Sequence, residues 1–275
     1  MRNSGLHIRI NSTLQDVLSH AQGLELPFFQ CFLTTRTGQL LSFEADDIQK
    51  FLEARRNYFK NLYVHGSYWI NLANIRYTNH YALFRELELA RKLEFTHMII
   101  HPGSTKGSEN RLDGIDAMAR VLNKLFVSPI LGDMQIVLEN TAHGSFSIGG
   151  DLHDFNVLLH KLDKPEKLQF CIDTAHAYVY GYNIKDEQEQ NIFIDLIESL
   201  LGINSIALLH LNDTQELCGS KIDQHEIPGM GNLGIQSLKR FALHQKLRDI
   251  PILMELPEVS QEREKEILAM VQNWF

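Results

Sequence analysis

Short apolar segments alternate with longer amphipathic segments along the whole chain. The short segments are rich in β-branched and aromatic residues, as expected for strands of a parallel sheet buried on both faces. They lie at 6–10, 27–33, 61–67, 96–103, 135–141, 168–174, 206–213 and 251–257. Apolar residues at helical spacing fill segments 13–24, 46–59, 77–93, 111–126, 151–162, 186–202, 235–247 and 259–275. Ser12 or Thr13 is expected to cap the first helix, and Asp46 the second.

Eight alternations of strand and helix in 275 residues predict one closed (β/α)8 barrel, a TIM barrel, that occupies residues 1–275 as a single domain. An open doubly wound α/β sheet is the second choice. That fold usually carries a glycine-rich phosphate-binding loop after its first strand, and segment 10–15 contains no glycine. No composition shift or low-complexity linker marks a domain boundary.

The composition indicates in which cellular compartment the protein works and which kinds of partner it binds. No apolar run approaches the length of a membrane span, and the N-terminal residues lack the apolar core of a signal peptide. Cys31, Cys171 and Cys218 form no C-x-x-C pair, which favours reduced thiols in a cytoplasmic protein. The formal net charge of -8 counts against a generally basic surface for nucleic acid. That count includes carboxylates that could bind metal, and three divalent ions would change it to about -2, from -8 + 6.

Metal-ligand residues stand at the ends of the predicted strands. Active sites of TIM barrels lie at the C-terminal ends of the strands, where loops from different strands meet. Six of the eight predicted strands end in, or lead into, histidines or carboxylates. These residues are His65, His101, Glu139, Asp173, His176, His210, Asp223, His225 and Glu255. Burial of an imidazole or a carboxylate costs free energy unless the group is paired or bound to a metal. Nine such residues at the same ends of the predicted strands therefore indicate a metal centre rather than unrelated residues of the barrel rim.

Nine ligands exceed the needs of one zinc ion, which usually takes three or four protein donors. With a bridging carboxylate they suit two or three divalent ions, and zinc and manganese share these donors. Clustered divalent metals are typical of phosphate-ester hydrolysis, in which they activate a water and stabilise the leaving oxygen. The residues alone therefore predict a polynuclear metal hydrolase that acts on a phosphodiester.

The motifs around these residues resemble those of the endonuclease IV family of apurinic/apyrimidinic (AP) DNA repair endonucleases, in the xylose-isomerase-like TIM barrel superfamily. They occur in the family's order and span about two-thirds of the chain. The motifs are HGSYWINLA (65–73), HPGS (101–104), LENTA (138–142), CIDTAHAYVYGY (171–182), HLNDT (210–214) and DQHEIPGMGNLG (223–234), with MELP (254–257) closing the series.

The resemblance implies three zinc ions, with manganese possible at one or more of the sites. It assigns His65, His101 and Glu139 to the first ion, Glu139, Asp173, His210 and Glu255 to the second, and His176, Asp223 and His225 to the third. Glu139 would thus bridge the first two ions.

The resemblance also implies a reaction. A hydroxide between the first two ions would attack the phosphate 5′ of an abasic deoxyribose, leaving a 3′-hydroxyl and a 5′-deoxyribose phosphate. Glu139, Glu255 and Asp173 would be the catalytic carboxylates, with Glu139 or Glu255 orienting the hydroxide. The expected partner is double-stranded DNA with abasic or 3′-blocked lesions, and the protein is expected to be a monomer.

Further residues are candidates for contacts with DNA. Tyr68 and Trp69 match the loop that the family inserts into a bent duplex, where an aromatic side chain can stack on an exposed base. Arg36, in the loop after the second strand, is another candidate. Gln224 is a fourth, although the family usually has an arginine there. Candidate phosphate contacts are Lys106, Arg111, Lys221 and Lys239.

Other functions stay open on the sequence alone. A sugar isomerase or epimerase of the related barrel superfamily needs fewer metals, so His176, Asp223 and His225 would be surplus to it. A UV-lesion endonuclease on the same barrel would differ only in its substrate. A non-catalytic DNA-damage binder would be expected to have lost metal ligands, and none of the nine is lost. A structural zinc site would favour a closed, cysteine-rich set of four ligands.

Overall fold

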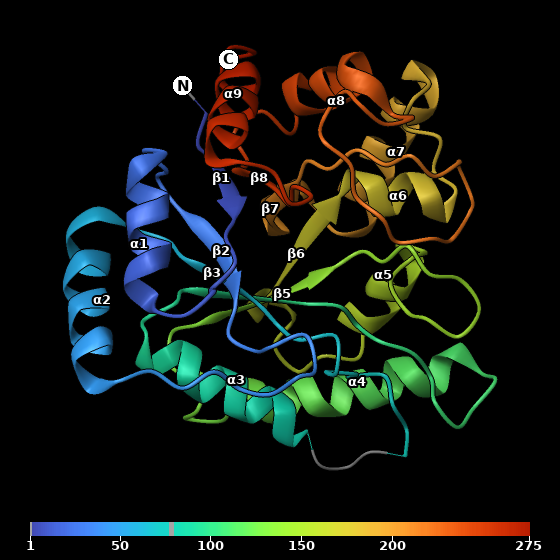
Figure 1. Cartoon of the computed structure of the whole chain (residues 1–275). Coiled ribbons are helices and arrows are strands. Elements are labelled where there is room, and N and C mark those ends of the chain that lie inside the picture. Colours follow the sequence, from blue (N-terminus) through green and yellow to red (C-terminus); the bar gives the residue numbers. More distant parts are fainter. Residues whose placement is uncertain (1, 77–79) are drawn as a thin grey trace.

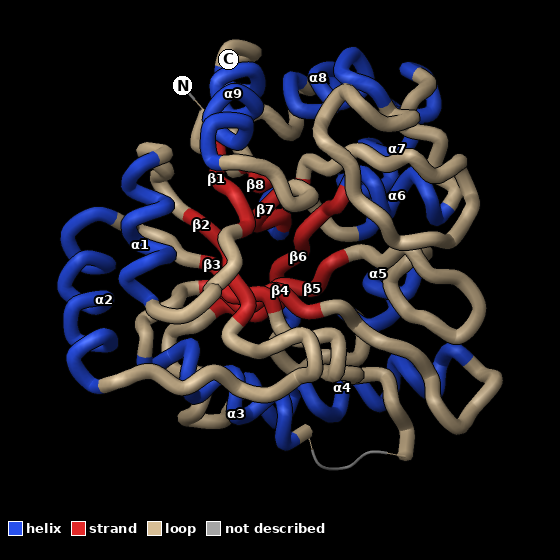
Figure 2. Tube along the Cα trace, in the orientation of Figure 1, coloured by secondary structure: helices blue, strands red, loops and turns tan. Residues whose placement is uncertain are grey.

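Eight parallel strands close into a barrel in the computed structural model, which describes residues 2–76 and 80–275. Each strand pairs with its neighbours in chain order, and β8 pairs with β1, so the predicted TIM barrel is confirmed. Figure 2 shows the strands at the centre with helices around them. The strands are β1 (Ser4–His7), β2 (Phe29–Phe32), β3 (Tyr63–His65), β4 (His97–Ile100), β5 (Gln135–Glu139), β6 (Leu168–Asp173), β7 (Ile206–His210) and β8 (Ile252–Met254).

Apart from α6, the helices in the described part of the chain lie close to the predicted segments. They are α1 (Leu14–Gly23), α2 (Ala45–Tyr58), α3 (Tyr81–Lys92), α4 (Arg111–Phe126), α5 (His153–Leu159), α6 (Thr174–Tyr180), α7 (Glu187–Leu200), α8 (Gly234–Leu243) and α9 (Gln261–Gln272). Two single 3-10 turns, Pro165–Lys167 and Ile203–Ser205, precede β6 and β7. The first three residues of the predicted helix 77–93 lie outside the described residues.

One predicted helix cap is confirmed and one is wrong. Thr13 caps α1, since its side chain accepts a hydrogen bond from the backbone N–H of Asp16, whose carboxylate accepts one from Thr13 N–H in return. Asp46 does not cap α2, because that helix already begins at Ala45. The Asp46 carboxylate instead pairs with Lys50 one turn later, at 2.6 Å.

Helix α6 was missed by the sequence interpretation. It follows β6 without an intervening loop, and the Asp173 carboxylate caps it by accepting a hydrogen bond of 2.8 Å from His176 N–H. Its residues are nearly all buried, so the segment carries no polar face that would separate it from the strand.

Closure of the barrel brings the two ends of the chain together. Ser4 pairs with Ile252 and Leu6 with Met254 in the parallel β1–β8 ladder. Both termini lie near these strands in Figure 1, and the Arg2 guanidinium is 5.2 Å from the centre of the Phe275 ring. No helix in the described part of the chain is long and apolar enough to cross a membrane.

The hydrophobic core has two parts. The larger lies between barrel and helices, and the smaller comprises Phe28, Tyr63, Ile99, Val137, Cys171, Leu208 and Leu253. In β5, Ile136 and Leu138 belong to the larger part and Val137 to the smaller, so Val137 faces the barrel interior. We call the smaller part the barrel floor.

Polar residues follow the barrel floor at a constant spacing. Glu139 stands two positions beyond Val137, so the strand alternation directs it into the barrel as well. The same step leads from Tyr63 to His65, Ile99 to His101, Cys171 to Asp173, Leu208 to His210 and Leu253 to Glu255. The fold therefore positions six of the predicted ligands as a polar layer directly on an apolar floor.

Candidate metal centre

All nine predicted ligand residues meet at one end of the barrel. Three overlapping groups have candidate ligand atoms that all lie within 4.8 Å of one another. The groups are His65, His101 and Glu139; Glu139, Asp173, His210 and Glu255; and Asp173, His176 and His225. Glu139 joins the first two groups and Asp173 joins the last two, so the three groups form one continuous centre.

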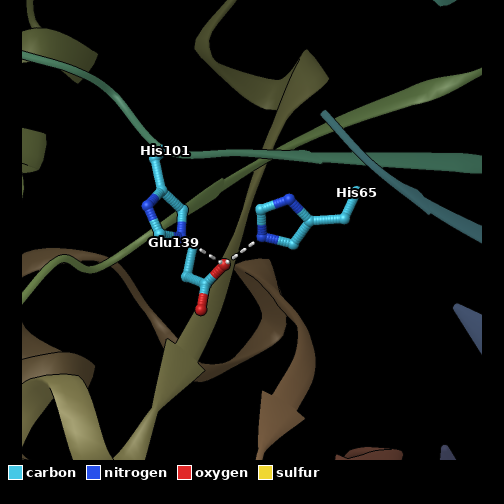
Figure 3. A group of neighbouring side chains, drawn as sticks. All are labelled: His65, His101 and Glu139. Atoms are coloured by element: carbon cyan, nitrogen blue, oxygen red, sulfur yellow. Dashed lines mark hydrogen bonds and ion pairs between the residues drawn. The ribbon is translucent and has the colours of Figure 1, made fainter. Parts of the chain in front are cut away.

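The first group is built around one carboxylate oxygen, as Figure 3 shows. Glu139 Oε2 lies 3.1 Å from His65 Nε2 and 3.2 Å from His101 Nε2. The other ring nitrogen of His65, Nδ1, is 2.8 Å from the carbonyl oxygen of Gly66. Because a carbonyl oxygen can only accept, His65 carries its proton on Nδ1 and presents Nε2 to the centre.

The second group surrounds the Nδ1 atom of His210. This atom lies 2.9 Å from Glu139 Oε1, 3.5 Å from Glu255 Oε2 and 3.8 Å from Asp173 Oδ2. His210, Glu139 and Asp173 are fully buried. Three carboxylates thus converge on one imidazole at the middle of the barrel mouth.

The third group lies beyond β6, where α6 and the loop after β7 meet. His176 Nε2 is 3.0 Å from Asp223 Oδ1 and 3.3 Å from His225 Nε2. His225 Nε2 lies 3.6 Å from both Asp223 Oδ1 and Asp173 Oδ2. The structure thus brings together the three residues predicted for the third ion and adds Asp173 to them.

Histidines and carboxylates of the centre shift one another's pKa values. Burial raises the pKa of Glu139, but His210 and His101 act against it and hold that pKa well below its ordinary value. Burial likewise opposes protonation of His176, yet Asp173 and Asp223 raise its pKa well above the ordinary value. The Glu139 carboxylate is therefore ionised at neutral pH.

Divalent cations fit this environment. Within residues 2–76 and 80–275, every ion pair of Glu139, Asp173, Asp223 and Glu255 is with a histidine, and none is with lysine or arginine. Four largely buried carboxylates without a fixed cation carry a desolvation cost that bound metal ions would offset. Imidazole nitrogen and carboxylate oxygen are also the donors that zinc and manganese accept.

Strands β1 and β2 also contribute to the centre, which sequence reasoning missed. Gln30 is fully buried and hydrogen-bonds to Glu255 and His210, and its amide nitrogen lies 2.9 Å from His7 Nδ1. Neither Gln30 nor His7 lies in a ligand motif. Counting two positions on from Gly5 and Phe28, as in the other strands, would have found both.

Cys171 forms part of the floor under the second group. Its sulfur lies within 4.8 Å of ligand atoms of Glu139 and His210. Burial raises the pKa of Cys171 to about 12, so the group remains a neutral thiol at physiological pH.

One carboxylate anchors the loop that carries Asp223 and His225. Asp213, in the first turn of this loop, is fully buried. Its two oxygens accept backbone hydrogen bonds of 2.8 to 3.2 Å from Thr214, Gly229, Gly231, Leu233 and Gly234. Asp213 also pairs with Glu226 through the backbone. The loop is thus tied at both ends around the third group.

The predicted DNA-contact residues surround the mouth. A cleft of about 770 Å³ is lined by Arg36, Tyr68 and Gln224, together with His225 and Glu255 of the centre. Tyr68 is 70% exposed although its ring centre lies 5.5 Å from that of His101, so it stands at the rim directly over the ligands.

Trp69 is 67% exposed and turns away from the ligands. Its indole ring packs on Gly38, where a Cβ would overlap the ring. Trp69 also lines a second cleft of about 450 Å³, which includes Lys106 and Arg85. Tyr68 and Trp69, which are neighbours in one loop, therefore line two different clefts.

Two of the predicted phosphate contacts have partners within the protein. Arg111 pairs with Asp154 and donates to the carbonyl oxygen of Ser145. Lys221 donates to the carbonyl oxygen of Tyr180, and its ammonium nitrogen is 3.3 Å from the centre of that ring. Both side chains stabilise loops of the mouth, which weakens their assignment to phosphate.

Comparisons with known proteins identify the family of the chain. A family model described as xylose isomerase-like TIM barrel matches residues 19–274. A protein of Thermosipho africanus named probable endonuclease 4 is 31% identical over 236 residues, which cover 82% of this chain and 82% of that protein. Apurinic-apyrimidinic endonuclease 1 of Plasmodium falciparum is 27% identical over 266 residues, which cover 94% of this chain and 44% of that protein. The crystal structure of endonuclease IV from Thermus thermophilus has a TM-score of 0.81 and 24% identity, and the match covers 99% of this chain and 98% of that one.

Proposed function

The chain belongs to the endonuclease IV family of the xylose isomerase-like TIM barrels, and we propose that it hydrolyses the phosphodiester 5′ to an abasic site in double-stranded DNA. The products are a 3′-hydroxyl and a 5′-deoxyribose phosphate. The protein is thus a metal-dependent, DNA-cleaving hydrolase of DNA repair, acting as a monomer on abasic or 3′-blocked lesions.

The observation that carries the proposal is the convergence of nine histidines and carboxylates at the barrel mouth. Eight of them form three overlapping groups, and the ninth, Asp223, lies 3.0 Å from His176 Nε2. A sugar isomerase or epimerase would leave the group around His176 without a role. Three groups bridged by Glu139 and Asp173 match the needs of phosphodiester cleavage, in which charge changes on the attacking oxygen, the phosphate and the leaving oxygen.

We assign three zinc ions to the centre, with manganese able to replace zinc at one or more positions. His65, His101 and Glu139 would hold the first, Glu139, Asp173, His210 and Glu255 the second, and His176, Asp223 and His225 the third. When bound, such ions lower the pKa of water and neutralise charge on the phosphate.

The chain's own residues supply the rest of the mechanism. Glu139 and Glu255 present carboxylate oxygens that orient the attacking water by accepting a hydrogen bond from it. The barrel floor excludes water from below, so charges at the centre interact more strongly than they would in solvent. Tyr68 and Trp69 offer exposed rings on which bases beside the abasic nucleotide stack.

The test is cleavage of a 5′-labelled duplex that carries one abasic-site analogue, with an undamaged duplex of the same sequence beside it. The protein is assayed after reloading with zinc, after reloading with manganese, and after chelation. Glu139→Ala is the inactive variant, and Glu198→Ala is its control, because Glu198 is an exposed carboxylate of α7 that does not line the cleft over the ligands.

We expect incision on the 5′ side of the analogue, with a 3′-hydroxyl end, only in the metal-loaded wild type and in Glu198→Ala. Absence of incision by protein shown to hold its ions would reject the abasic substrate. Duplexes with ultraviolet lesions, and then sugar substrates, would be assayed next. Tight binding of the lesion without cleavage would instead indicate a damage-binding protein.

A further inference from the structure

A buried side chain of β2 contacts two residues of the second ligand group. Gln30 has no exposed surface and lies at the level of the ligands, two positions beyond Phe28 of the barrel floor. It stands between His210 and Glu255, and hydrogen-bonds to both. The side-chain amide of Gln30 ends in one nitrogen and one oxygen atom. The neighbouring groups determine which position the nitrogen occupies and which the oxygen.

The Glu255 carboxylate identifies the amide nitrogen. The Gln30 atom 2.6 Å from Glu255 Oε1 faces a group that only accepts hydrogen bonds, so it is the NH2 nitrogen. The second hydrogen of this NH2 group points to His7 Nδ1, 2.9 Å away, which accepts it. The opposite end of the amide is therefore the carbonyl oxygen.

The carbonyl oxygen in turn fixes the tautomer of His210. It lies 3.0 Å from His210 Nε2, and a carbonyl accepts only, so Nε2 carries a hydrogen and donates it. The lone pair of the ring is then on Nδ1, the atom that faces Glu139, Asp173 and Glu255. An imidazole must offer its lone pair to bind a metal ion.

We propose that Gln30 is the positioning residue of the second metal site. It holds His210 in the tautomer that presents Nδ1, and it donates to Glu255 Oε1. The other oxygen, Oε2, accepts from Asn212 Nδ2 at 3.3 Å and faces His210 Nδ1. This inference rests on the proposed metal-dependent function, but it concerns metal binding and not the identity of the DNA substrate.

The other two groups fix their histidines differently. His65 Nδ1 is 2.8 Å from the carbonyl oxygen of Gly66, and His176 Nδ1 is 2.9 Å from that of Asn140. Both present Nε2 to the centre while Nδ1 faces a backbone carbonyl oxygen, and Glu139 Oε1 also lies 3.3 Å from His176 Nδ1. His210 presents Nδ1 through a side-chain contact, so a single substitution at Gln30 separates the second site from the other two.

The test compares Gln30→Met with Gln190→Met. Gln190 is also fully buried, and its amide nitrogen donates to the carbonyl oxygens of Ile184 and Ser237, away from the ligand groups. Both variants lose the hydrogen bonds of a buried amide while keeping side-chain volume. Zinc content and affinity are measured by competition with a chromophoric chelator, and folding by thermal unfolding of the chelated proteins.

We expect Gln30→Met to bind one of the three ions about 10 to 100 times more weakly, with the other two unchanged. Gln190→Met should keep wild-type zinc binding even where its melting temperature falls. Equal zinc affinities in both variants and the wild type would overturn the proposal. A loss of zinc that merely follows the loss of folding in both variants would also overturn it.

A second measurement determines the tautomer of His210 directly. It uses the wild-type protein, so it does not depend on whether Gln30→Met folds. In zinc-loaded protein with 15N-labelled histidine, His210 should show a metal-bound Nδ1 and a protonated Nε2 protected from exchange. A metal-bound Nε2 would reject the assignment. Neither experiment involves DNA, so a failure to incise abasic duplex would not contradict the role of Gln30. Wild-type zinc binding by Gln30→Met would reject the role of Gln30 without contradicting the proposed function.

Discussion

The carboxylate of Asp213 occupies the space that a side chain at residue 231 would need. A Cβ added to Gly231 would overlap Asp213 Oδ1 and the carbonyl oxygen of Thr214. Glycine at this position lets the loop wrap closely around the carboxylate, which accepts a hydrogen bond from Gly231 N–H at 3.1 Å. The placement of Asp223 and His225 therefore depends on a residue outside the ligand groups.

Gly231→Ala should displace the loop and weaken binding of the third ion by about tenfold or more, because Asp213 can no longer collect its backbone donors. Gly144→Ala is the matched control, since a Cβ there meets only the Lys221 side chain at an ordinary 3.4 Å. Zinc stoichiometry after dialysis against a weak chelator measures the effect. Full zinc content in Gly231→Ala would show that the loop tolerates the change.

Glu139→Ala should lose bound zinc and nearly all cleavage of abasic duplex while the barrel remains folded. Glu139 is shared by the first two groups, and its removal leaves His65, His101 and His210 without a common carboxylate. Metal analysis, circular dichroism and the incision assay together measure this outcome. Wild-type turnover would contradict the bridging assignment.

Tyr68→Ala should keep the metals and weaken discrimination between abasic and intact duplex by roughly 1–3 kcal/mol, the usual contribution of one stacked base. Tyr58→Ala is a suitable control because Tyr58 is a similarly exposed tyrosine at the end of α2. Binding of both duplexes is measured in the presence of the ions, with a non-cleavable phosphate analogue at the scissile position so that no incision occurs. Unchanged discrimination would assign Tyr68 to packing of the rim.

His97, at the start of β4, should make the stability of the metal-free protein depend on pH. Burial against Tyr63 lowers the pKa of His97 to about 4 from its ordinary 6.5. The folded state therefore binds fewer protons than the unfolded state between these values. The contribution to stability is present above pH 6.5 and is lost as the pH falls towards 4, by at most about 3 kcal/mol.

The measurement is the free energy of unfolding between about pH 4 and pH 7 for the wild type, His97→Phe and His160→Phe, all free of metal. Only His97→Phe should flatten the profile, since His160 is exposed at the end of α5. Parallel profiles for all three proteins would show that His97 does not titrate in this range.

The barrel and the ligands were predictable because each depends on a short-range pattern. Alternating strand and helix segments determine the barrel, and ligand residues were visible because they end apolar strands. The cap assigned to Asp46 failed because α2 begins one residue earlier, at Ala45. Asp47 accepts hydrogen bonds from the backbone N–H groups of Leu14 and Gln15, and this contact between α1 and α2 leaves no trace in either local sequence.

Gln30 and His7 were missed because their role exists only in three dimensions. The residues that Gln30 contacts, His210 and Glu255, stand 180 and 225 positions later in the chain. A glutamine in an apolar strand carries no metal-ligand signal by itself. Helix α6 was missed because an all-buried helix and a continuing strand have the same apolar composition.

Each of the six ligands in the polar layer lies two positions beyond a residue of the barrel floor. An insertion or deletion of a single residue between the two would therefore turn the ligand to the other face of its strand. Removal of one residue between Val137 and Glu139 would turn the carboxylate outward, among the helices, while every other side chain of β5 up to that point kept its place. Changes of length after the ligand, in contrast, alter only the loops of the mouth. Natural variation in length should therefore accumulate on the DNA-facing side of each ligand, where substrate preference can diverge without disturbing the metal centre.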